Sequence, residues 1–302
     1  MLKRLWSYQR ERFPLLTHGI VIAAFSASAI AFSAWARHAA LPAWWILASG
    51  FVSSLIFFAQ MRIADEWKDA EDDAKFRPYR PVPRGLITLH ELAWVAVAGG
   101  IIQLAVALFI APHLIPLLVA VWAYFAFMSR EFFVGRWLRS HPAVYIASHM
   151  LIVPMIDFYV SSFDWLVAHA IAPHALVWFL SVTYCNGVAV EVGRKIRAPR
   201  DEEHGVETYS ALWGRTGATA VWCMATAVTV AIAVAAASFA TLGRYDIPIF
   251  CIALACAIVI GYLFLRHPVH NTAQLIEAFS GTWTVVLYLS LGLLPFAIGA
   301  SS

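Results

Sequence analysis

The chain has 302 residues, of which 61% are hydrophobic and 13% are charged, and its mean hydropathy is +0.72. Soluble domains average roughly 45–50% apolar and about 25% charged residues, so this composition excludes a water-soluble globular protein and favours one membrane domain. The 21 Lys and Arg residues against 18 Asp and Glu residues give a net charge of +3, which is too small to indicate a nucleic-acid partner.

Apolar runs of about 20 residues, long enough to cross a hydrocarbon core of about 30 Å as a helix, recur along the chain. None of these runs shows the alternation of a membrane β-strand. The sequence therefore predicts an all-α polytopic membrane protein, in which nine transmembrane helices form a bundle around a central cavity and residues 1–302 make a single domain. The nine predicted spans are 17–36, 41–61, 92–110, 114–128, 142–161, 171–190, 217–240, 247–265 and 280–300.

Basic residues are retained on the cytoplasmic side of a membrane, and their positions in this chain alternate. Nineteen of the 21 fall before the first span or after the second, fourth, sixth and eighth, whereas Arg37 and Arg244 fall in the opposite connections. This pattern predicts a cytoplasmic N-terminus and a C-terminus on the other side of an inner or plasma membrane. The stretch before Thr17 is basic like a signal peptide, but the run that follows has membrane length and leads into a second span, so we expect it to be retained.

Two of the inner connections, 62–86 and 191–216, carry unusually many charges. Residues 61–86 include six acidic and six basic side chains, and residues 191–215 include five of each. Burying one charge at the bilayer centre costs roughly 2.5–3.5 kcal/mol, so both loops belong in water or in a polar cavity. They are four spans apart, which lets them meet over the centre of a bundle. We expect them to form the polar cap of an active site.

Carboxylates in the first charged loop are spaced for one helix face. If the second helix continues into this loop, Glu66, Asp69 and Asp73 lie at i, i+3 and i+7 within two turns. A cation would offset their repulsion, and ligands that are all oxygen suit Mg²⁺, which completes its shell with substrate phosphates and water. Basic residues downstream are suited to bind those phosphates. The alternative is a solvated face of ion pairs beside the membrane.

This loop also resembles a known signature. Residues 65–73 read Asp-Glu-Trp-Lys-Asp-Ala-Glu-Asp-Asp, and residues 80–85 read Arg-Pro-Val-Pro-Arg-Gly. They resemble the first signature of the UbiA-type intramembrane prenyltransferases, Asn-Asp-x-x-Asp-x-x-x-Asp followed by Arg-Pro, Pro and Gly. The nine helices and two acidic cytoplasmic loops of that family match the pattern above. The resemblance implies that Asp69 and Asp73 bind Mg²⁺ and diphosphate, with Asp65 in the Asn position and Glu66 in place of an Asp.

The second charged loop matches the family less closely. Measured back from Gly205, Asp201 falls on the last acid of an Asp-x-x-Asp-x-x-x-Asp pattern, but Arg194 and Arg197 occupy the two earlier acid positions. Guanidinium groups there would weaken or remove a second metal site, yet they can bind diphosphate oxygens directly. A shift of register that uses Glu191 or residues 202–203 as ligands stays open, as does an incidental charged loop.

The resemblance implies Mg²⁺-dependent transfer of a prenyl group from an isoprenoid diphosphate to a lipophilic acceptor, aromatic or other, within the membrane. Loss of diphosphate leaves an allylic cation, so the leaving group must be neutralised and the cation kept from water. The candidate catalytic residues are Glu66, Asp69, Asp73 and Asp201; the metal candidates are these four and Asp65; the diphosphate candidates are Arg80, Arg194, Lys195 and Arg197; the acceptor candidates are Asn186 and Glu91.

Other functions remain open at this point. Asp157 and His149 lie inside the fifth predicted span, where ionisable side chains are rare and often functional, and they are compatible with a transporter or carrier that relays protons. Transport sites are expected near the membrane midplane, whereas 11 of the 18 acids fall in the two charged loops. A related membrane transferase or a terpene cyclase acting on another diphosphate or activated phosphate would share the metal loop.

Overall fold

The computed structural model describes residues 2–239 and 243–299, which form helices and connecting turns. The elements are α1 (Leu2–Arg12), α2 (Leu15–Ala36), α3 (Trp44–Lys68), α4 (Ala70–Phe76), α5 (Leu89–Ile110), η1 (Pro112–Leu114), α6 (Ile115–Ser129), η2 (Glu131–Phe133), α7 (Gly135–Arg139), α8 (Pro142–Met150), α9 (Ile152–Trp165), α10 (Leu176–Gly193), α11 (Tyr209–Phe239), α12 (Gly243–Arg266), α13 (His270–Gly292) and α14 (Leu294–Ala297).

Nine stretches of these described residues are long and apolar enough to cross a membrane. They are α2, α3, α5, η1 with α6, α8 with α9, α10, α11, α12 and α13. The prediction of an all-α protein with nine spans is therefore confirmed. The predicted ends of two spans, Ala240 and Ala300, lie outside the described residues.

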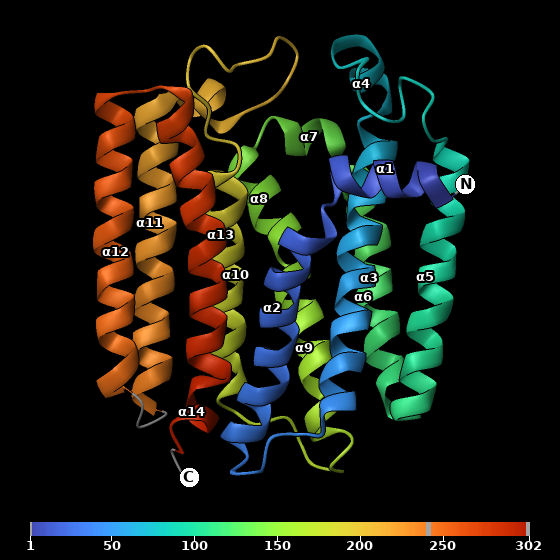
Figure 1. Cartoon of the computed structure of the whole chain (residues 1–302), viewed down its shortest axis with the longest axis vertical. Coiled ribbons are helices and arrows are strands. Elements are labelled where there is room, and N and C mark those ends of the chain that lie inside the picture. Colours follow the sequence, from blue (N-terminus) through green and yellow to red (C-terminus); the bar gives the residue numbers. More distant parts are fainter. Residues whose placement is uncertain (1, 240–242, 300–302) are drawn as a thin grey trace.

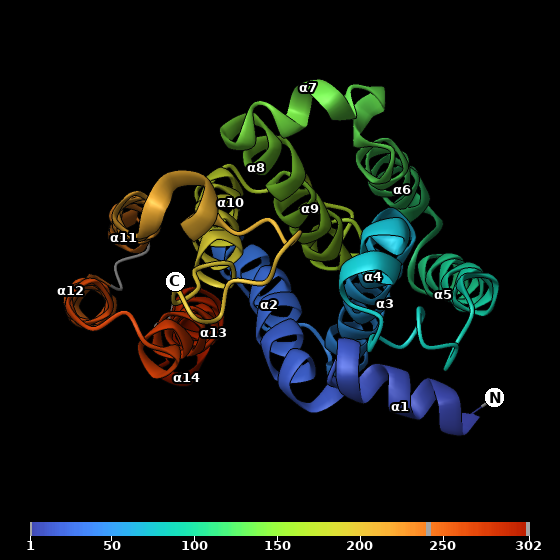
Figure 2. The same ribbon diagram turned by 90° about the horizontal axis from the view of Figure 1, so that it is seen from above.

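The spans form one upright bundle with its connections at two ends (Figure 1). Seen from above, α2 and α9 lie toward the middle, whereas α5 and the α11–α12 pair lie at opposite edges (Figure 2). The helices α1, α4 and α7 and the loop between α10 and α11 gather at one end of the bundle, and the chain ends near α14 at the other. The two charged loops therefore lie on the same side of the molecule.

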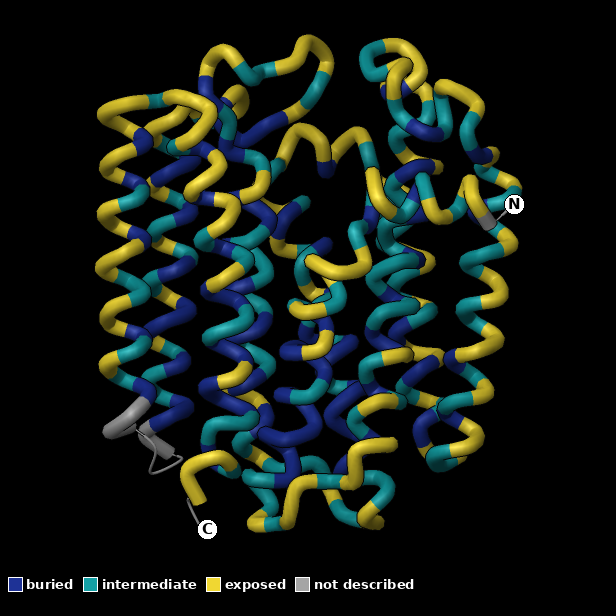
Figure 3. The backbone as a smooth tube through the Cα atoms, viewed as in Figure 1, coloured by how far each residue is buried: buried dark blue, intermediate teal, exposed yellow. Residues whose placement is uncertain are grey.

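Apolar side chains face outward as well as inward in this bundle. Buried residues line the inner faces of the helices and exposed residues the outer faces (Figure 3), but the exposed set includes Trp94, Phe109 and Ile258. Water would disfavour so much exposed apolar surface, whereas lipid accommodates it. Small residues allow the helices to approach closely: a Cβ on Gly292 of α13 would lie 2.4 Å from the Cα of Ser28 on α2.

Several helix ends differ from their predicted positions for local reasons. Helix α5 begins at Leu89 because Thr88 and Glu91 form a capping box, in which each side chain bonds the backbone N–H of the other residue. Helix α13 begins at His270, ten residues before the predicted span, and ends at Gly292. Its polar first turns carry the helix beyond the apolar run. Helix α11 is interrupted at Gly214, where φ is +70°.

Candidate active site

The two charged loops touch each other directly. Tyr79 of the first loop donates a hydrogen bond to Glu203 of the second, with 3.2 Å between Oη and Oε2. Phe76, at the end of α4, packs edge-on against His204, and the ring centroids are 5.6 Å apart. Gly205 has a φ of +77°, and a Cβ there would lie 2.6 Å from the Phe76 ring. A glycine is required at that point, and the predicted meeting of the loops is observed.

Two of the predicted metal ligands in the first loop are paired with arginines, although Oε2 of Glu66 has no hydrogen-bond partner among the described residues. Glu66 is buried, and its Oε1 accepts hydrogen bonds from Arg12 of α1 at 2.6 Å and from Arg62 at 2.9 Å. Asp73 is also buried, and it is held by Arg77 at 2.7 Å and by Arg80 at 2.6 Å. Unpaired charges in these positions would be costly, so the arginines compensate both carboxylates.

The remaining two carboxylates, Asp65 and Asp69, keep unused oxygens. Asp65 makes one long ion pair, 3.5 Å to Arg62, and half of its side chain is exposed. Asp69 follows the last residue of α3, and its carboxylate has no hydrogen bond or ion pair among the described residues. Burial, and then the like charges of Asp65 and Asp73, raise the pKa of Asp69. This pair is where a cation would relieve the strongest uncompensated repulsion in the loop.

The full predicted ligand set is not brought together. Within the described part of the chain, no three His, Cys, Asp or Glu side chains are arranged to hold a metal ion by themselves. Glu66 and Asp73 pair with arginines instead. Magnesium commonly uses only one or two protein carboxylates and takes its other oxygens from phosphates and water. Asp65 and Asp69 therefore fit Mg²⁺ together with a diphosphate, but not Mg²⁺ alone.

Arg194 is a residue of the second loop whose charge acts on Asp65. It is anchored by Glu191 at 2.5 Å, yet 47% of its side chain is exposed. The pKa of Arg194 is raised by Glu191 first, and Asp65 contributes as well, so the two loops interact electrostatically across the site. Lys195 also binds Glu191, at 3.0 Å, and 31% of its side chain is exposed. Both predicted diphosphate residues thus present accessible positive charge beside Asp65.

Other second-loop candidates point elsewhere. Arg197 pairs with Glu277 of α13 at 3.2 Å, and Asp201 lies 3.0 Å from His270 at the start of α13. Glu202 and Glu203 accept hydrogen bonds from Thr208 and Tyr79. Asp201, Glu202 and Glu203 therefore each have a partner of their own, and no contact of Asp201 with Asp69 or Asp73 is seen among the described residues.

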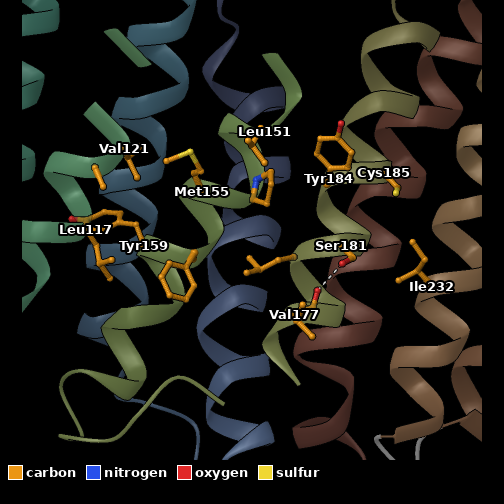
Figure 4. Close-up of a pocket in the computed structure, with 14 residues that line it drawn as sticks. Leu117, Val121, Leu151, Met155, Tyr159, Val177, Ser181, Tyr184, Cys185 and Ile232 are labelled. Atoms are coloured by element: carbon orange, nitrogen blue, oxygen red, sulfur yellow. Dashed lines mark hydrogen bonds between the residues drawn. The ribbon is translucent and has the colours of Figure 1, made fainter. Parts of the chain in front are cut away.

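The predicted acceptor residues do not share a pocket. Glu91 caps α5 and binds Arg4 of α1, and Asn186 is buried and donates to Thr284 at 3.0 Å. A cavity of about 580 Å³ lies instead between α6, α9 and α10 (Figure 4). Its walls are almost entirely apolar, and Leu151 and Tyr184 stand at the end nearer the charged loops. The structure therefore places a large apolar pocket beside α9.

Sequence reasoning missed the residues that arrange this site. Arg12 lies in α1, outside both charged loops, and only the fold brings it to Glu66. Lys68 was overlooked inside the first signature, although it binds Tyr145 of α8 and Glu131 of η2. The position of Lys68 directly before Asp69 was the one signal in the sequence for such a role. Nothing in the sequence links Glu131 or Tyr145 to the first loop.

These features define a multi-pass integral membrane protein with a charged cap over an apolar bundle. Residues 25–283 match the model of the UbiA prenyltransferase family, and the chain belongs to that family. The fold is similar to the apo structure of a UbiA homologue from Aeropyrum pernix K1, with a TM-score of 0.69, 15% identity, and coverage of 94% of this chain and 98% of that one.

A second solved structure, described as digeranylgeranylglyceryl phosphate synthase in membranes, is similar with a TM-score of 0.59 and 15% identity. The alignment covers 96% of this chain and 98% of the other. At this identity the two likenesses describe the fold. No curated protein sequence matches the chain significantly.

Proposed function

We propose that this protein transfers a prenyl group from an isoprenoid diphosphate to a lipophilic acceptor in a Mg²⁺-dependent reaction. One observation carries the proposal: Asp65, half exposed, lies near the accessible Arg194 of the second loop, and Asp69, one helix turn further on, makes no hydrogen bond or ion pair with any residue that the structure describes. Membership of the UbiA prenyltransferase family supports the transferase class. The acceptor class, aromatic or other, is part of the proposal.

Each charged group has a distinct task in this reaction. Mg²⁺ would neutralise the diphosphate as its bond to the prenyl carbon breaks. Asp65 and Asp69 supply carboxylate oxygens to hold the metal–diphosphate, and Arg194 donates hydrogen bonds to the phosphate oxygens. Arg77 and Arg80 keep Asp73 compensated, and Arg12 does the same for Glu66. These arginine pairs hold the first loop in shape beside the metal ligands.

The hydrocarbon parts of donor and acceptor need an apolar surface at the level of the lipid chains. The cavity beside α9 offers one, because residues such as Phe158, Leu180 and Val121 line it. A dry surface of this kind protects an allylic cation from water. The distribution of Lys and Arg supports an orientation with the charged loops and the N-terminus in the cytoplasm, in an inner or plasma membrane.

The proposal is tested with the purified full-length protein in detergent or nanodiscs. Release of diphosphate is followed with prenyl diphosphates of several chain lengths, with and without Mg²⁺, in the presence of lipophilic acceptors. We expect release that requires Mg²⁺ and is lost in Asp69→Asn. Asp72→Asn is the matched control, because Asp72 is exposed on α4 of the same loop and should leave the rate unchanged.

Absence of Mg²⁺-dependent release from every donor would contradict the proposal, and so would equal rates for Asp69→Asn and Asp72→Asn. Accumulation of a labelled solute in vesicles without release of diphosphate would favour a carrier instead. A cyclised hydrocarbon product formed without an acceptor would keep the metal site but assign a cyclase.

A further inference from the structure

A third connection, between α6 and α7, reaches the first charged loop through one ion pair. Lys68, the last residue of α3, lies 2.7 Å from Glu131 of η2 and donates a hydrogen bond to the hydroxyl of Tyr145 at 2.6 Å. Glu131 is largely buried, with 15% of its side chain exposed, whereas 28% of the Lys68 side chain is exposed. Three separate elements therefore hold the ammonium group, whose charge also acts on Asp69.

The backbone around Glu131 is unusual in a way that serves this contact. Glu131, Phe132 and Phe133 have φ values of +49°, +52° and +60°, a left-handed conformation that side chains other than glycine adopt at a cost. A Cβ on Gly135 would lie 2.1 Å from Oε2 of Glu131. Three residues of this connection therefore have strained backbone conformations, and a side chain at Gly135 would collide with the Glu131 carboxylate. In this arrangement the Glu131 carboxylate contacts Lys68.

Aromatic packing holds the same turn and its partner. The Phe132 ring packs edge-on against Tyr124 and His149, with centroid distances of 5.5 and 5.9 Å. His149 in turn stacks on Tyr145 at 3.9 Å. The two acceptors of the Lys68 hydrogen bonds therefore belong to one packed unit, which limits the movement of the ammonium group.

The charge of Lys68 acts on the proposed metal ligands. It is one of the cations that offset the carboxylates of Asp65 and Asp69. An ammonium group has three N–H donors, and Tyr145 and Glu131 use two of them. The third donor is available to an anion bound between Asp69 and Arg194. A diphosphate brings more negative charge than one metal ion neutralises, so an additional cation there has a clear use.

We propose that Lys68 binds the diphosphate of the donor, and that Glu131 and Tyr145 are positioning residues that hold its ammonium group for this purpose. The inference rests on the proposed function, because it assigns a further residue to the same donor site. A purely structural ion pair is the alternative, in which Lys68 and Glu131 only tie the third connection to α3.

Removal of either partner breaks the ion pair between Lys68 and Glu131. A purely structural role therefore predicts similar effects of both removals on diphosphate binding, whereas the proposal predicts different ones. We would measure Mg²⁺-dependent binding of inorganic diphosphate to the purified full-length protein by calorimetry, together with its thermal unfolding. Lys68→Gln should weaken binding tenfold or more, since it removes a charge-assisted hydrogen bond to the ligand. Glu131→Gln keeps an amide oxygen that holds Lys68 in place and removes a competing negative charge, so its affinity for diphosphate should exceed that of the wild type.

Matched controls separate local from general charge effects. Lys3→Gln removes a positive charge from an exposed site on α1, and Glu11→Gln breaks the exposed ion pair to Arg84; both should bind diphosphate like the wild type. Lys68→Arg keeps the charge and should retain more affinity than Lys68→Gln. If Lys68→Gln does not fold, the Glu131→Gln result still decides: a gain in diphosphate affinity supports the proposal, and an unchanged or lower affinity contradicts it.

Equal affinities of Lys68→Gln and the wild type would overturn this inference, and so would a loss in Glu131→Gln as large as that in Lys68→Gln. If the wild type itself binds neither inorganic diphosphate nor prenyl diphosphates with Mg²⁺, the proposed function has failed. Binding by the wild type with no effect at Lys68 contradicts only the role of Lys68.

Discussion

The two charged loops are similar in composition but opposite in the charge that they leave accessible. In residues 62–86, arginines pair with Oε1 of Glu66 and with both oxygens of Asp73, whereas Asp65 makes one long ion pair and Asp69 makes none within the described part of the chain. In residues 191–216, Asp201 binds His270 on α13, and the exposed group near the centre is Arg194. One loop therefore presents anions and the other presents cations across the same site.

This asymmetry indicates a division of tasks between metal and phosphate. A pair of loops that both presented carboxylates would need more than one cation to offset their repulsion. Here the guanidinium of Arg194 supplies part of that charge permanently, because arginine stays protonated. The site is suited to one Mg²⁺ held by the first loop and a diphosphate held between the loops.

The largest expected effect tests which loop holds the metal. Asp69→Asn should lower Mg²⁺-dependent diphosphate release by about 100-fold or more, because it removes one of the two uncommitted ligands. Asp201→Asn should lower it less than about threefold, because its contact is the exposed His270. Initial rates at saturating Mg²⁺ measure both. Equal losses in the two variants would show that the second loop also contributes a metal ligand.

A second test concerns the arginine that secures Glu66. Arg12→Ala leaves this buried carboxylate with Arg62 as its remaining partner, and the loss of a charge-assisted hydrogen bond should cost roughly 1.5–3 kcal/mol of stability. Thermal unfolding in one detergent measures the change. Glu66→Gln in the same background should recover part of the loss, because it removes the uncompensated charge. If Arg12→Ala is as stable as the wild type, α1 does not secure the first loop.

The sequence allowed the fold to be predicted because lipid imposes simple requirements on it. Apolar length alone identified the nine spans, and charge placed both loops at one end. Helix ends were predicted less accurately, since the capping box of Thr88 and Glu91 and the polar start of α13 at His270 depend on local hydrogen bonds rather than on hydropathy.

The candidate site was predictable only in part. The signature spacing singled out Asp69 together with Glu66 and Asp73, but spacing assumes one continuous helix face and does not show which of these carboxylates pair with arginines. Arg12 and Glu131 are distant in sequence from the first loop, so their contacts with Glu66 and Lys68 required the tertiary structure. The sequence likewise does not distinguish Arg194, which faces Asp65, from Arg197, which faces Glu277.

The third prediction concerns the different surroundings of Arg194 and Arg197. Arg194→Ala should weaken donor binding about tenfold through the loss of a charge-assisted hydrogen bond, with Mg²⁺ binding retained. Arg197→Ala should change donor affinity less than about twofold, because its ion pair to Glu277 is exposed and distinct from the site. Titration with a non-hydrolysable prenyl diphosphate analogue compares them. A larger loss for Arg197→Ala would place the diphosphate nearer α13 than we propose.

The smallest expected effect is on the free energy of unfolding. It distinguishes Asp69, which has no ion pair with another described residue, from Asp73, which is paired with arginines. The pKa of Asp69 is raised in the folded protein by burial and by Asp65 and Asp73. The native state therefore binds more protons than the unfolded state between the ordinary and the raised pKa, so stability without metal falls as the pH rises through that interval. Asp69→Asn removes this penalty and should stabilise the metal-free protein by less than about 1 kcal/mol. The free energy of unfolding of this variant should not fall as the pH rises through the same interval.

Asp73→Asn should do the opposite, because Arg77 and Arg80 would lose the buried carboxylate that they share, and the melting temperature should fall. Added Mg²⁺ should raise the melting temperature of the wild type but not that of Asp69→Asn. Unfolding curves that begin below the ordinary pKa of Asp, from about pH 3.5 to about pH 8, with and without Mg²⁺, measure all three outcomes. If both Asn variants shift the melting temperature in the same direction, the two carboxylates are equivalent, and the contrast between paired and uncommitted acids in this loop is wrong.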